Sequence, residues 1–214
     1  TPGLDYRFHG KWTVNDYGRQ FTFDAFVEAE PLNRRGVVEY LRRLCPGIGD
    51  ALANKLCDLY GAEKAIGVLK INPEQVVKDL GGKWLKLEKA KESAAILKEE
   101  EKWQQTKVEL LGILAGNGFR SECIEKAIAR WGIHAPRKIR RDPFCLLVAD
   151  MPGAGFITCD KLWAKLGLPK DRLRRQAICA WWILEDKSNG STWMKTDVVM
   201  SELGRMISGK VEPD

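Results

Sequence analysis

The chain has 214 residues, of which 44% are hydrophobic and 30% charged, a composition typical of folded globular proteins and not of disordered ones. This length is enough for one large domain or for two to three small ones. The formal net charge of +6 favours a polyanionic partner, either nucleic acid or an anionic membrane surface. The longest compact apolar run, residues 177–184, is too short to cross a bilayer, so we expect no membrane-spanning segment.

Neither a signal peptide nor a metal-binding spacing of cysteines is visible in the sequence. The chain begins with Thr1, so we expect a processed chain or a piece of a longer protein. No C-x-x-C pair occurs, and only two histidines are present. We therefore expect no metal site, and we predict reduced, buried thiols in a cytoplasmic protein. The six cysteines are Cys45, Cys57, Cys123, Cys145, Cys159 and Cys179.

Residues 1–31 differ from the rest of the chain because they are rich in aromatic and β-branched residues. The runs RFHGKWTV (residues 7–14) and RQFTFDAFVEA (residues 19–29) flank NDYG (residues 15–18), which has turn composition. This pattern predicts a β-hairpin. A lone hairpin is marginally stable in water, so we expect it to pack on helices or to be the remnant of a larger β-domain.

From Leu32 onward, apolar residues recur at spacings of three and four, which predicts helices separated by short glycine turns. Four such turns occur, at residues 47–49, 81–82, 116–118 and 153–155. Their first glycines are 34, 35 and 37 residues apart, and a constant period of this size indicates an internal repeat.

A second pattern has twice this period and makes the repeat a pair of pairs. Gly61 and then Asn-Pro at residues 72–73 separate the first two turns, and Gly132 and then Asp-Pro at residues 142–143 separate the last two. Glycine suits a helix C-cap, and Asn or Asp before proline suits the start of the next helix. Between the pairs, residues 84–114 predict one long helix or two abutting ones.

The first turn, in the stretch PGIGDALANK, has the features of a backbone phosphate site. Gly47 and Gly49 permit positive φ and carry no Cβ that blocks a ligand. We expect Ile48 to anchor the turn in the core, while the helix that begins near Asp50 points free N–H groups outward. A phosphate can approach such a helix start, and Lys55 adds charge one turn further on. A tight turn with purely structural glycines stays the alternative.

This arrangement resembles a helix-hairpin-helix motif, whose contacts to phosphates are independent of base sequence. The fourth turn, in MPGAGFITCDKL, keeps the proline, both glycines and a small residue four positions after Gly155, so we rank it with the first as a DNA contact. The third keeps both glycines and offers Arg120 with Ser121 as a cap, but Glu122 replaces the small residue, and its role stays open. The second, in DLGGKWLKL, is degenerate, so we expect it to be structural.

Basic residues concentrate around the fourth turn. Residues 137–175 contain ten Lys or Arg and four Asp or Glu, a net charge of +6 that equals the net charge of the whole chain. The blocks RKIRR (137–141) and KDRLRR (170–175) flank the turn, so we expect them to attract DNA. The alternative to DNA binding is that these basic residues only form a solvated charged face. The predicted DNA-binding set is Gly47, Ile48, Gly49, Asp50, Lys55, Gly116, Gly118, Arg120, Arg137, Lys138, Arg140, Arg141, Gly153, Ala154, Gly155, Phe156, Lys161, Arg172, Arg174 and Arg175.

Two groups of aromatic residues bear on the same question. Trp181 and Trp182 lie in the helical stretch ICAWWILED, and we expect core positions for both. The aromatic residues of the hairpin fit either base stacking on single strands or a β-core, and the sequence leaves both open. They are Trp12, Tyr17, Phe21 and Phe23.

The sequence contains no catalytic arrangement. The pattern G-x-x-x-x-G-K-[ST] is missing, so these 214 residues hold no recognisable ATP phosphate loop. Two histidines give no Ser-His-Asp or Cys-His arrangement. A DNA glycosylase with one helix-hairpin-helix is disfavoured by the tandem layout. We therefore expect no enzymatic activity and no cofactor in this chain.

Five stretches occur in an order that resembles the amino-terminal region of RecD-like ATP-dependent DNA helicases, relatives of the alpha subunit of exodeoxyribonuclease V. They are GKWTVNDYGRQFTF, YLRRLCPGIGDALANKLCDLYG, NPEQVVKDLGG, DPFCLLVADMPGAGFITCDKLWAKLG and GSTWMKTDVVMSEL, between about Phe8 and Leu203. The sequence departs from the family pattern in the second turn and at Ser191, where a histidine is common.

The resemblance implies the last strands of an OB-like barrel, two paired helix-hairpin-helix units, a helical segment and then a motor. In the family, the motor hydrolyses ATP with Mg²⁺ and moves 5′ to 3′ on single-stranded DNA. That motor is absent from these 214 residues, so we expect a fragment or an excised regulatory domain.

We therefore predict a mainly α-helical, non-catalytic DNA-binding region of a RecD-like helicase that acts in DNA repair and recombination. The expected divisions are a partial OB-like hairpin at 1–31, paired helix-hairpin-helix units at 32–104 and 105–168, and a C-terminal helical segment at 169–214. One alternative is a scaffold with structural hairpins that docks a partner protein or the helicase motor. Another is a junction-binding module that acts alone.

Overall fold

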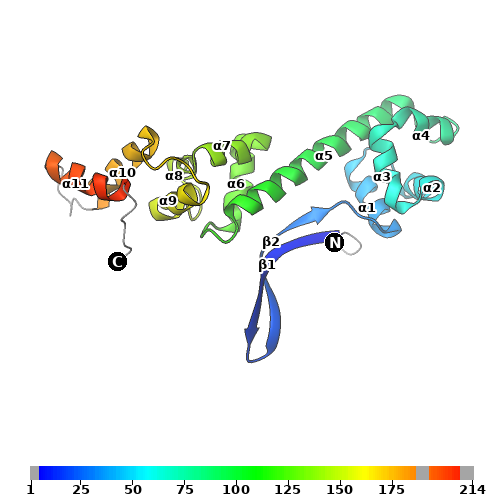
Figure 1. Ribbon diagram of the computed structural model, residues 1–214. Helices are drawn as coiled ribbons and strands as arrows, with labels where there is room; N and C mark the ends of the chain where they lie inside the picture. The colour runs from blue at the N-terminus through cyan, green and yellow to red at the C-terminus, as the bar shows by residue number, and fades with distance from the viewer. Residues whose placement is uncertain (1–4, 187–192, 208–214) are drawn as a thin grey trace. The chain divides into compact units, whose positions relative to one another are not determined.

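The computed structural model describes residues 5–186 and 193–207 (Figure 1). The fold is mainly α-helical with one N-terminal hairpin, as predicted, and the chain divides into two compact units, Thr1–Ala115 and Gly116–Asp214. The division expected between residues 104 and 105 falls inside a helix, and the boundary of the units lies after Ala115. No helix in the described ranges combines the length and apolarity that a membrane span needs.

The predicted hairpin is present. Strands β1 (Asp5–Asn15) and β2 (Gly18–Ala29) pair antiparallel, and the backbone N–H of Tyr17 donates to Asn15 Oδ1 at 3.0 Å in the turn (Figure 1). A register shift between residues 9 and 10 explains Gly10. A Cβ at this position would lie 2.1 Å from the carbonyl oxygen of Thr22, so only glycine fits the irregularity.

The hairpin carries two groups of aromatic rings that contact one another. Phe8 contacts Phe23 with a centroid distance of 5.1 Å and an interplanar angle of 66°, and Trp12 contacts Phe21 at 5.3 Å. These rings are about half exposed; Trp12 is 61% exposed. Contacts between neighbouring rings stabilise the hairpin, while the exposed part of each ring stays accessible, so the β-core and the base-stacking interpretations both stay predictions.

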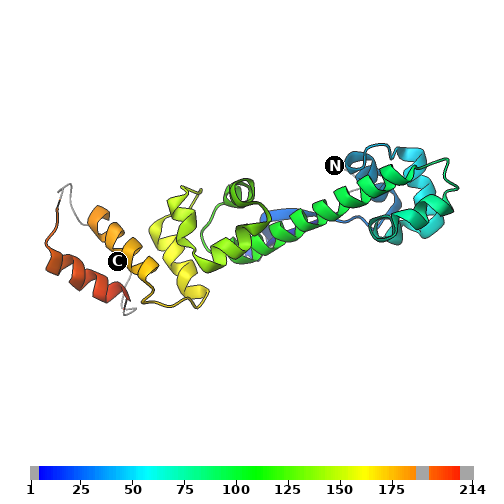
Figure 2. The same ribbon diagram turned by 90° about the horizontal axis from the view of Figure 1, so that it is seen from above.

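The remaining elements of the first unit are five helices around one core. Leu41, Leu56, Leu69 and Leu97 are buried in it on the apolar faces of their helices, and Ile48 is buried from the turn between α1 and α2. Residues 87–114 form one unbroken helix, which decides between the two predicted arrangements (Figure 2). The helices are α1 (Arg34–Leu44), α2 (Asp50–Tyr60), α3 (Ala62–Ile71), α4 (Pro73–Asp79) and α5 (Leu87–Leu114).

A nearly buried lysine ties the base of the hairpin to two helices of this unit. Lys70 Nζ on α3 lies 2.6 Å from Glu30 Oε2, just after β2, and 3.3 Å from Glu101 Oε2 on α5. Burial opposes the charge of Lys70, but the two carboxylates more than offset it and raise the pKa. The ion pairs therefore compensate the charge that the fold buries.

The second unit is a run of short helices packed around aromatic residues. Phe144 is fully buried, and its ring lies 5.5 Å from that of Trp163 and 5.8 Å from that of Phe156. The predicted C-terminal segment contains two helices in its described part, and Ser191 lies outside the described residues. The elements are α6 (Ser121–Trp131), the 3-10 helix η1 (Gly132–His134), α7 (Ala135–Arg141), α8 (Phe144–Val148), α9 (Phe156–Lys165), α10 (Leu173–Asp186) and α11 (Thr196–Ile207).

The prediction that both tryptophans of α10 belong to the core is wrong for one of them. Trp181 is 47% exposed because it points away from the face that buries Ile178 and Ile183. Trp182 is partly buried and stacks on Phe156, with a centroid distance of 4.5 Å and an interplanar angle of 10°.

All six cysteines are buried and unpaired, as predicted for structural thiols. Burial raises the pKa of Cys145 and Cys159 to about 12, so these thiols stay protonated at neutral pH.

The two Asx-Pro pairs start helices in different ways. Asn72 occupies the N-cap position with Pro73 as the first residue of α4, although no side-chain hydrogen bond caps the helix. Asp142 Oδ1 accepts a hydrogen bond from the backbone N–H of Phe144 at 3.1 Å, so α8 begins one residue after the proline.

Candidate nucleic-acid interface

The first turn has the backbone geometry that the sequence predicts. Gly47 has φ +89°, which favours glycine, and Ile48 is 2% exposed and anchors the turn in the core. The N–H of Ile48 donates to the carbonyl oxygen of Cys45 at 3.0 Å. Gly49 is the N-cap of α2 in extended conformation, and no side chain caps the helix. Because the first helical bond is that of the Ala53 N–H to Gly49, the preceding N–H groups have no acceptor within the helix.

The fourth turn repeats this geometry with an offset of 106 residues. Gly153 has φ +80°, and the N–H of Ala154 donates to the carbonyl oxygen of Met151 at 2.9 Å. Gly155 is the uncapped, extended N-cap of α9, and the N–H of Cys159 donates to its carbonyl oxygen. The first and fourth turns are therefore equivalent, hydrogen bond for hydrogen bond.

The third turn lies two residues later than the sequence predicts. Gly118, with φ +86°, takes the place of Gly47 and Gly153, because the N-cap of α6 is Arg120. Ser121 is the first residue of α6 and caps nothing. The position of the small residue is then Ile124, which is buried but larger than Ala53 and Cys159, so the departure from the other turns lies at Ile124 and not at Glu122.

The second turn contributes no glycine at its helix start. Gly81 and Gly82 both have positive φ, but they terminate α4, and the N–H of Gly82 donates to the carbonyl oxygen of Val77. Leu85, 4% exposed, fills the anchoring role of Ile48, and the N-cap of α5 is Lys86. In the second turn, Leu85 and Lys86 therefore occupy the positions that Ile48 and Gly49 occupy in the first turn.

The four N-cap residues form a pattern that sequence reasoning missed. Gly49, Lys86, Arg120 and Gly155 are spaced by 37, 34 and 35 residues, and each unit holds one glycine and one basic residue. A cation at a helix N-terminus opposes the helix dipole and weakens the helix, unless an anion is bound there. The sequence did contain a cue for this pattern, because Lys86 directly follows the buried Leu85.

Within each unit, the two turns lie side by side. In the first unit, Lys89 on α5 lies against Gly47, with its Cδ 4.0 Å from the place of a Cβ on that glycine. In the second, Gly153 lies against the backbone of Arg120, and Lys165 Nζ donates to Asn117 Oδ1 at 2.9 Å. The third turn, left open by the sequence, therefore belongs to the same surface as the fourth.

The basic block at residues 137–141 lies on one exposed face of α7. Arg137 and Arg141 are exposed, while Ile139 between them is fully buried and holds the helix. Lys138 and Arg140 are also exposed, and Lys138 Nζ lies 5.5 Å from the ring centroid of Trp131. This block fits the predicted electrostatic role.

The block at residues 170–175 does not fit that role, because its arginines hold the fold. Arg175 is 6% exposed and makes a bidentate pair with Asp160 at 2.7 and 3.0 Å, which raises its pKa. It also donates to the carbonyl oxygens of Lys170 and Met206. The predicted DNA contact of Arg175 would therefore have to compete with these buried contacts, and the structure gives this side chain a role in the fold.

The other two arginines of this block are engaged but exposed in part. Arg174 Nε lies 3.0 Å from Asp142 Oδ2, and Arg172 Nη1 donates to the carbonyl oxygen of Arg141 at 3.1 Å. Lys161 on α9, by contrast, is exposed beside the fourth turn.

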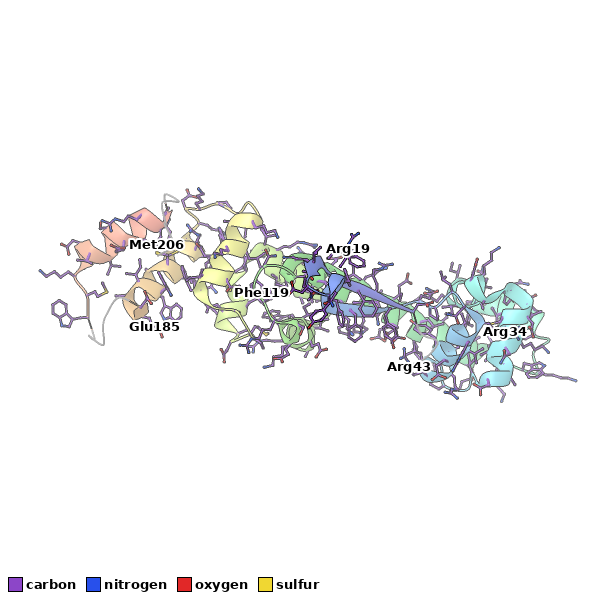
Figure 3. The ribbon with its side chains drawn as sticks, turned by 90° about the horizontal axis from the view of Figure 1, so that it is seen from below. Arg19, Arg34, Arg43, Phe119, Glu185 and Met206 are labelled. Atoms are coloured by element: carbon purple, nitrogen blue, oxygen red, sulfur yellow. The ribbon has the colours of Figure 1, made fainter. Side chains whose placement is uncertain are left out.

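A cavity of about 710 Å³ opens between α1 and α2 near the first turn. Three arginines line it, among them Arg34, which is labelled in Figure 3. Arg34 donates to Asn54 Oδ1 at 2.9 Å and to Asp58 Oδ1 at 2.7 Å. Arg42 Nε lies 3.8 Å from Asp50 Oδ1. The Asp50 carboxylate is thus directed to a protein cation, so Asp50 can offer a phosphate only its backbone N–H.

Paired turns of this geometry, repeated in two units, define a tandem helix-hairpin-helix protein. Residues 103–193 match the family model of the helix-hairpin-helix domain of ATP-dependent RecD2 DNA helicases. The predicted resemblance to the helix-hairpin-helix region of RecD-like helicases is therefore confirmed.

The ATP-dependent RecD2 DNA helicase of Deinococcus radiodurans is 30% identical to this chain over 175 residues. The matched part is 79% of this chain and 23% of the relative, so the chain spans about a quarter of the relative's length. No solved structure matches the chain at a significant level.

Proposed function

We propose that this chain binds DNA without sequence preference, as the N-terminal region of a RecD-like helicase that acts in DNA repair and recombination. The observation that carries the proposal is the equivalence of the first and fourth turns. Each turn combines a positive-φ glycine, a buried anchor and an uncapped helix start, and the two sequences differ in most other positions. Selection for packing alone would not require both helix starts to stay uncapped.

The binding chemistry follows from the helix starts. The N–H groups of residues 50–52 and 156–158 donate to phosphate oxygens of the DNA backbone, where the helix dipole favours negative charge. Lys86 and Arg120 at the neighbouring turns, with Lys161 and the exposed face of α7, neutralise further phosphates. Phosphates carry no base identity, so binding is independent of sequence.

The relative's name supports the wider role. The relative is an ATP-dependent DNA helicase, which supports the proposal that this chain holds DNA for a motor domain that binds ATP and Mg²⁺. We place this activity in the cytoplasm. We expect this region to position DNA for the motor and to carry no hydrolysis itself.

The test is fluorescence anisotropy with single-stranded, duplex and forked DNA of two unrelated sequences, across salt concentrations from about 50 to 200 mM. We expect equal affinity for both sequences and an affinity that falls steeply with salt. Failure to bind any DNA at the lowest salt contradicts the proposal.

A scaffold role that docks the helicase motor is the second candidate, because α10 and α11 expose several large apolar side chains. Trp181 is 47% exposed and Met200 is 60% exposed. Binding of a motor fragment in the absence of DNA, lost on Trp181→Ser, supports this role.

A further inference from the structure

We propose that Trp84 stacks against an unpaired DNA base, next to the backbone held by the first turn. This inference rests on the proposed function. Trp84 is 48% exposed on the loop between α4 and α5. Leu80 and Leu85, each 4% exposed, anchor the loop on both sides, so the tryptophan is held on a fixed stretch of backbone.

Trp84 lies beside the helix that the first turn begins. Lys55 Nζ, on α2, is 4.1 Å from the centroid of the Trp84 ring. Lys55 follows Asp50 by five residues, so its Cα lies about 8 Å along α2 from the helix start. Lys89, at the beginning of α5, lies against Gly47 of the first turn. These contacts bring the loop and the first turn onto one surface of the first unit.

The surroundings of the ring are cationic. In the part of the chain that the structure describes, Lys55, Lys83 and Lys86 form no ion pair with a carboxylate. An aromatic ring among unneutralised lysines is the combination that proteins use for single-stranded nucleic acid, where the cations follow the backbone and the ring takes a base. A lysine above the ring can turn to a phosphate without leaving the site.

Trp84 differs in this respect from the rings of the hairpin. Several hairpin rings contact one another, as Phe8 and Phe23 do edge-on, and Arg19 covers part of Trp12. Among the described residues, no aromatic ring packs against Trp84. Its exposed half is therefore open to a base. The second turn, which sequence reasoning treats as structural, then contributes a ring in place of backbone amides.

The experiment compares two single strands of equal length, about 16 nucleotides, one of oligothymidylate and one abasic throughout. They carry the same phosphates and differ only in bases. We expect Trp84→Ala to weaken binding of oligothymidylate by about 5- to 150-fold, the effect of one stacked base, and to leave binding of the abasic strand unchanged. Trp84→Phe keeps a ring and retains most of the affinity. Ile71→Ala, which removes another exposed apolar side chain of the same unit, changes neither.

Equal losses on both strands, or no loss on either, overturn the stacking contact while DNA binding stands. Absence of binding by the unaltered chain to both strands and to duplex DNA overturns the proposed function, and this inference with it. Circular dichroism of each variant shows whether the helices are retained.

Discussion

Gly153 lies directly against the backbone of Arg120: a Cβ on Gly153 would be 3.1 Å from the Arg120 nitrogen and 3.2 Å from the Gly118 carbonyl oxygen. The fourth turn can thus pack closely on the backbone of the third turn because Gly153 has no side chain. Because a main chain cannot move aside like the end of a flexible side chain, this glycine is required twice, once for its φ of +80° and once for the close approach.

The two requirements can be separated by two alanine substitutions. Gly116→Ala introduces only backbone strain, because φ is +71° and the space around it is open, and we expect a loss of about 1 kcal/mol in the free energy of unfolding. Gly153→Ala adds the clash, and we expect a loss of about 2 kcal/mol or more. Urea unfolding followed by circular dichroism measures both. Equal losses would show that the third and fourth turns do not pack as described.

The N-cap glycines permit a test of phosphate binding that does not harm the fold. Gly49 and Gly155 have ordinary extended backbone, and a Cβ on either meets no atom within 4 Å. Asp is a better N-cap than glycine, by a few tenths of a kcal/mol. We therefore expect Gly49→Asp and Gly155→Asp to be at least as stable as the parent, yet to bind DNA at least about tenfold more weakly, because the carboxylate occupies the N–H groups and repels phosphate.

Gly49→Ser is the matched control, since its hydroxyl caps the helix without a charge. We expect a loss of affinity intermediate between those of the parent and Gly49→Asp in anisotropy titrations. A Gly49→Asp, Gly155→Asp double variant that binds like the parent at low salt would rule out these turns as the contact.

Local patterns predicted the hairpin and the first turn because neighbours in sequence decide both. Turn composition between alternating strands fixes the hairpin, and a Gly-x-Gly with Ile48 between fixes the turn. The third turn was misplaced because its first glycine, Gly116, also has positive φ, so a Gly-x-Gly pattern existed two residues too early. Which glycine precedes the helix start depends on where α6 packs, which local sequence does not encode.

The charge pattern does not distinguish an exposed arginine from a buried one, for a related reason. Arg137 and Arg175 contribute equally to a charge count made from the sequence. Asp160 lies fifteen residues before Arg175, and the two residues pair only in the folded chain. The place of Lys86 at the N-cap of α5 was missed for the opposite reason. It breaks the local rule that helix starts avoid cations, and local exceptions of this kind occur where a ligand compensates them.

The two basic blocks are expected to differ in their contribution to DNA binding. Arg137→Gln with Arg141→Gln removes two exposed cations, so the slope of log K against log salt should fall in magnitude by about 1.4 to 1.8. Arg174→Gln removes a cation that already pairs with Asp142, so we expect a change in slope well below one phosphate. Salt titrations at constant pH compare them, and a larger effect for Arg174→Gln would contradict the assignment.

We expect Lys86 to lower the stability of the fold and to raise the affinity for DNA. Lys86→Ser replaces a cation at the start of α5 by a good N-cap, so we expect a gain of about 0.5 to 1 kcal/mol in the free energy of unfolding. The same change removes one phosphate contact, and affinity for duplex and single-stranded DNA should fall together. Lys64→Ser, on an exposed position of α3, is the control. If Lys86→Ser binds DNA like the parent, the lysine has no part in the interface.

The buried thiols predict a loss of stability in alkali. Burial raises the pKa of Cys159 from 9.0 to about 12, so the folded chain keeps a proton that the unfolded chain releases above pH 9.0. The unfolded state then binds fewer protons than the folded one, and the free energy of unfolding falls as pH rises, by about 1.4 kcal/mol per pH unit for each such thiol. The stabilisation is complete below pH 9.0 and is lost progressively towards pH 12.

Cys159→Ala isolates one thiol from the others. The fold accepts alanine at this position, because Ala53 occupies the equivalent place after the first turn and is fully buried. We expect the parent to lose its stability relative to Cys159→Ala by about 1.4 kcal/mol per pH unit in urea titrations above about pH 9, and the difference between the two to be constant below it. A difference that stays constant through this range would mean that solvent reaches the Cys159 thiol, and that α9 does not pack closely behind the fourth turn.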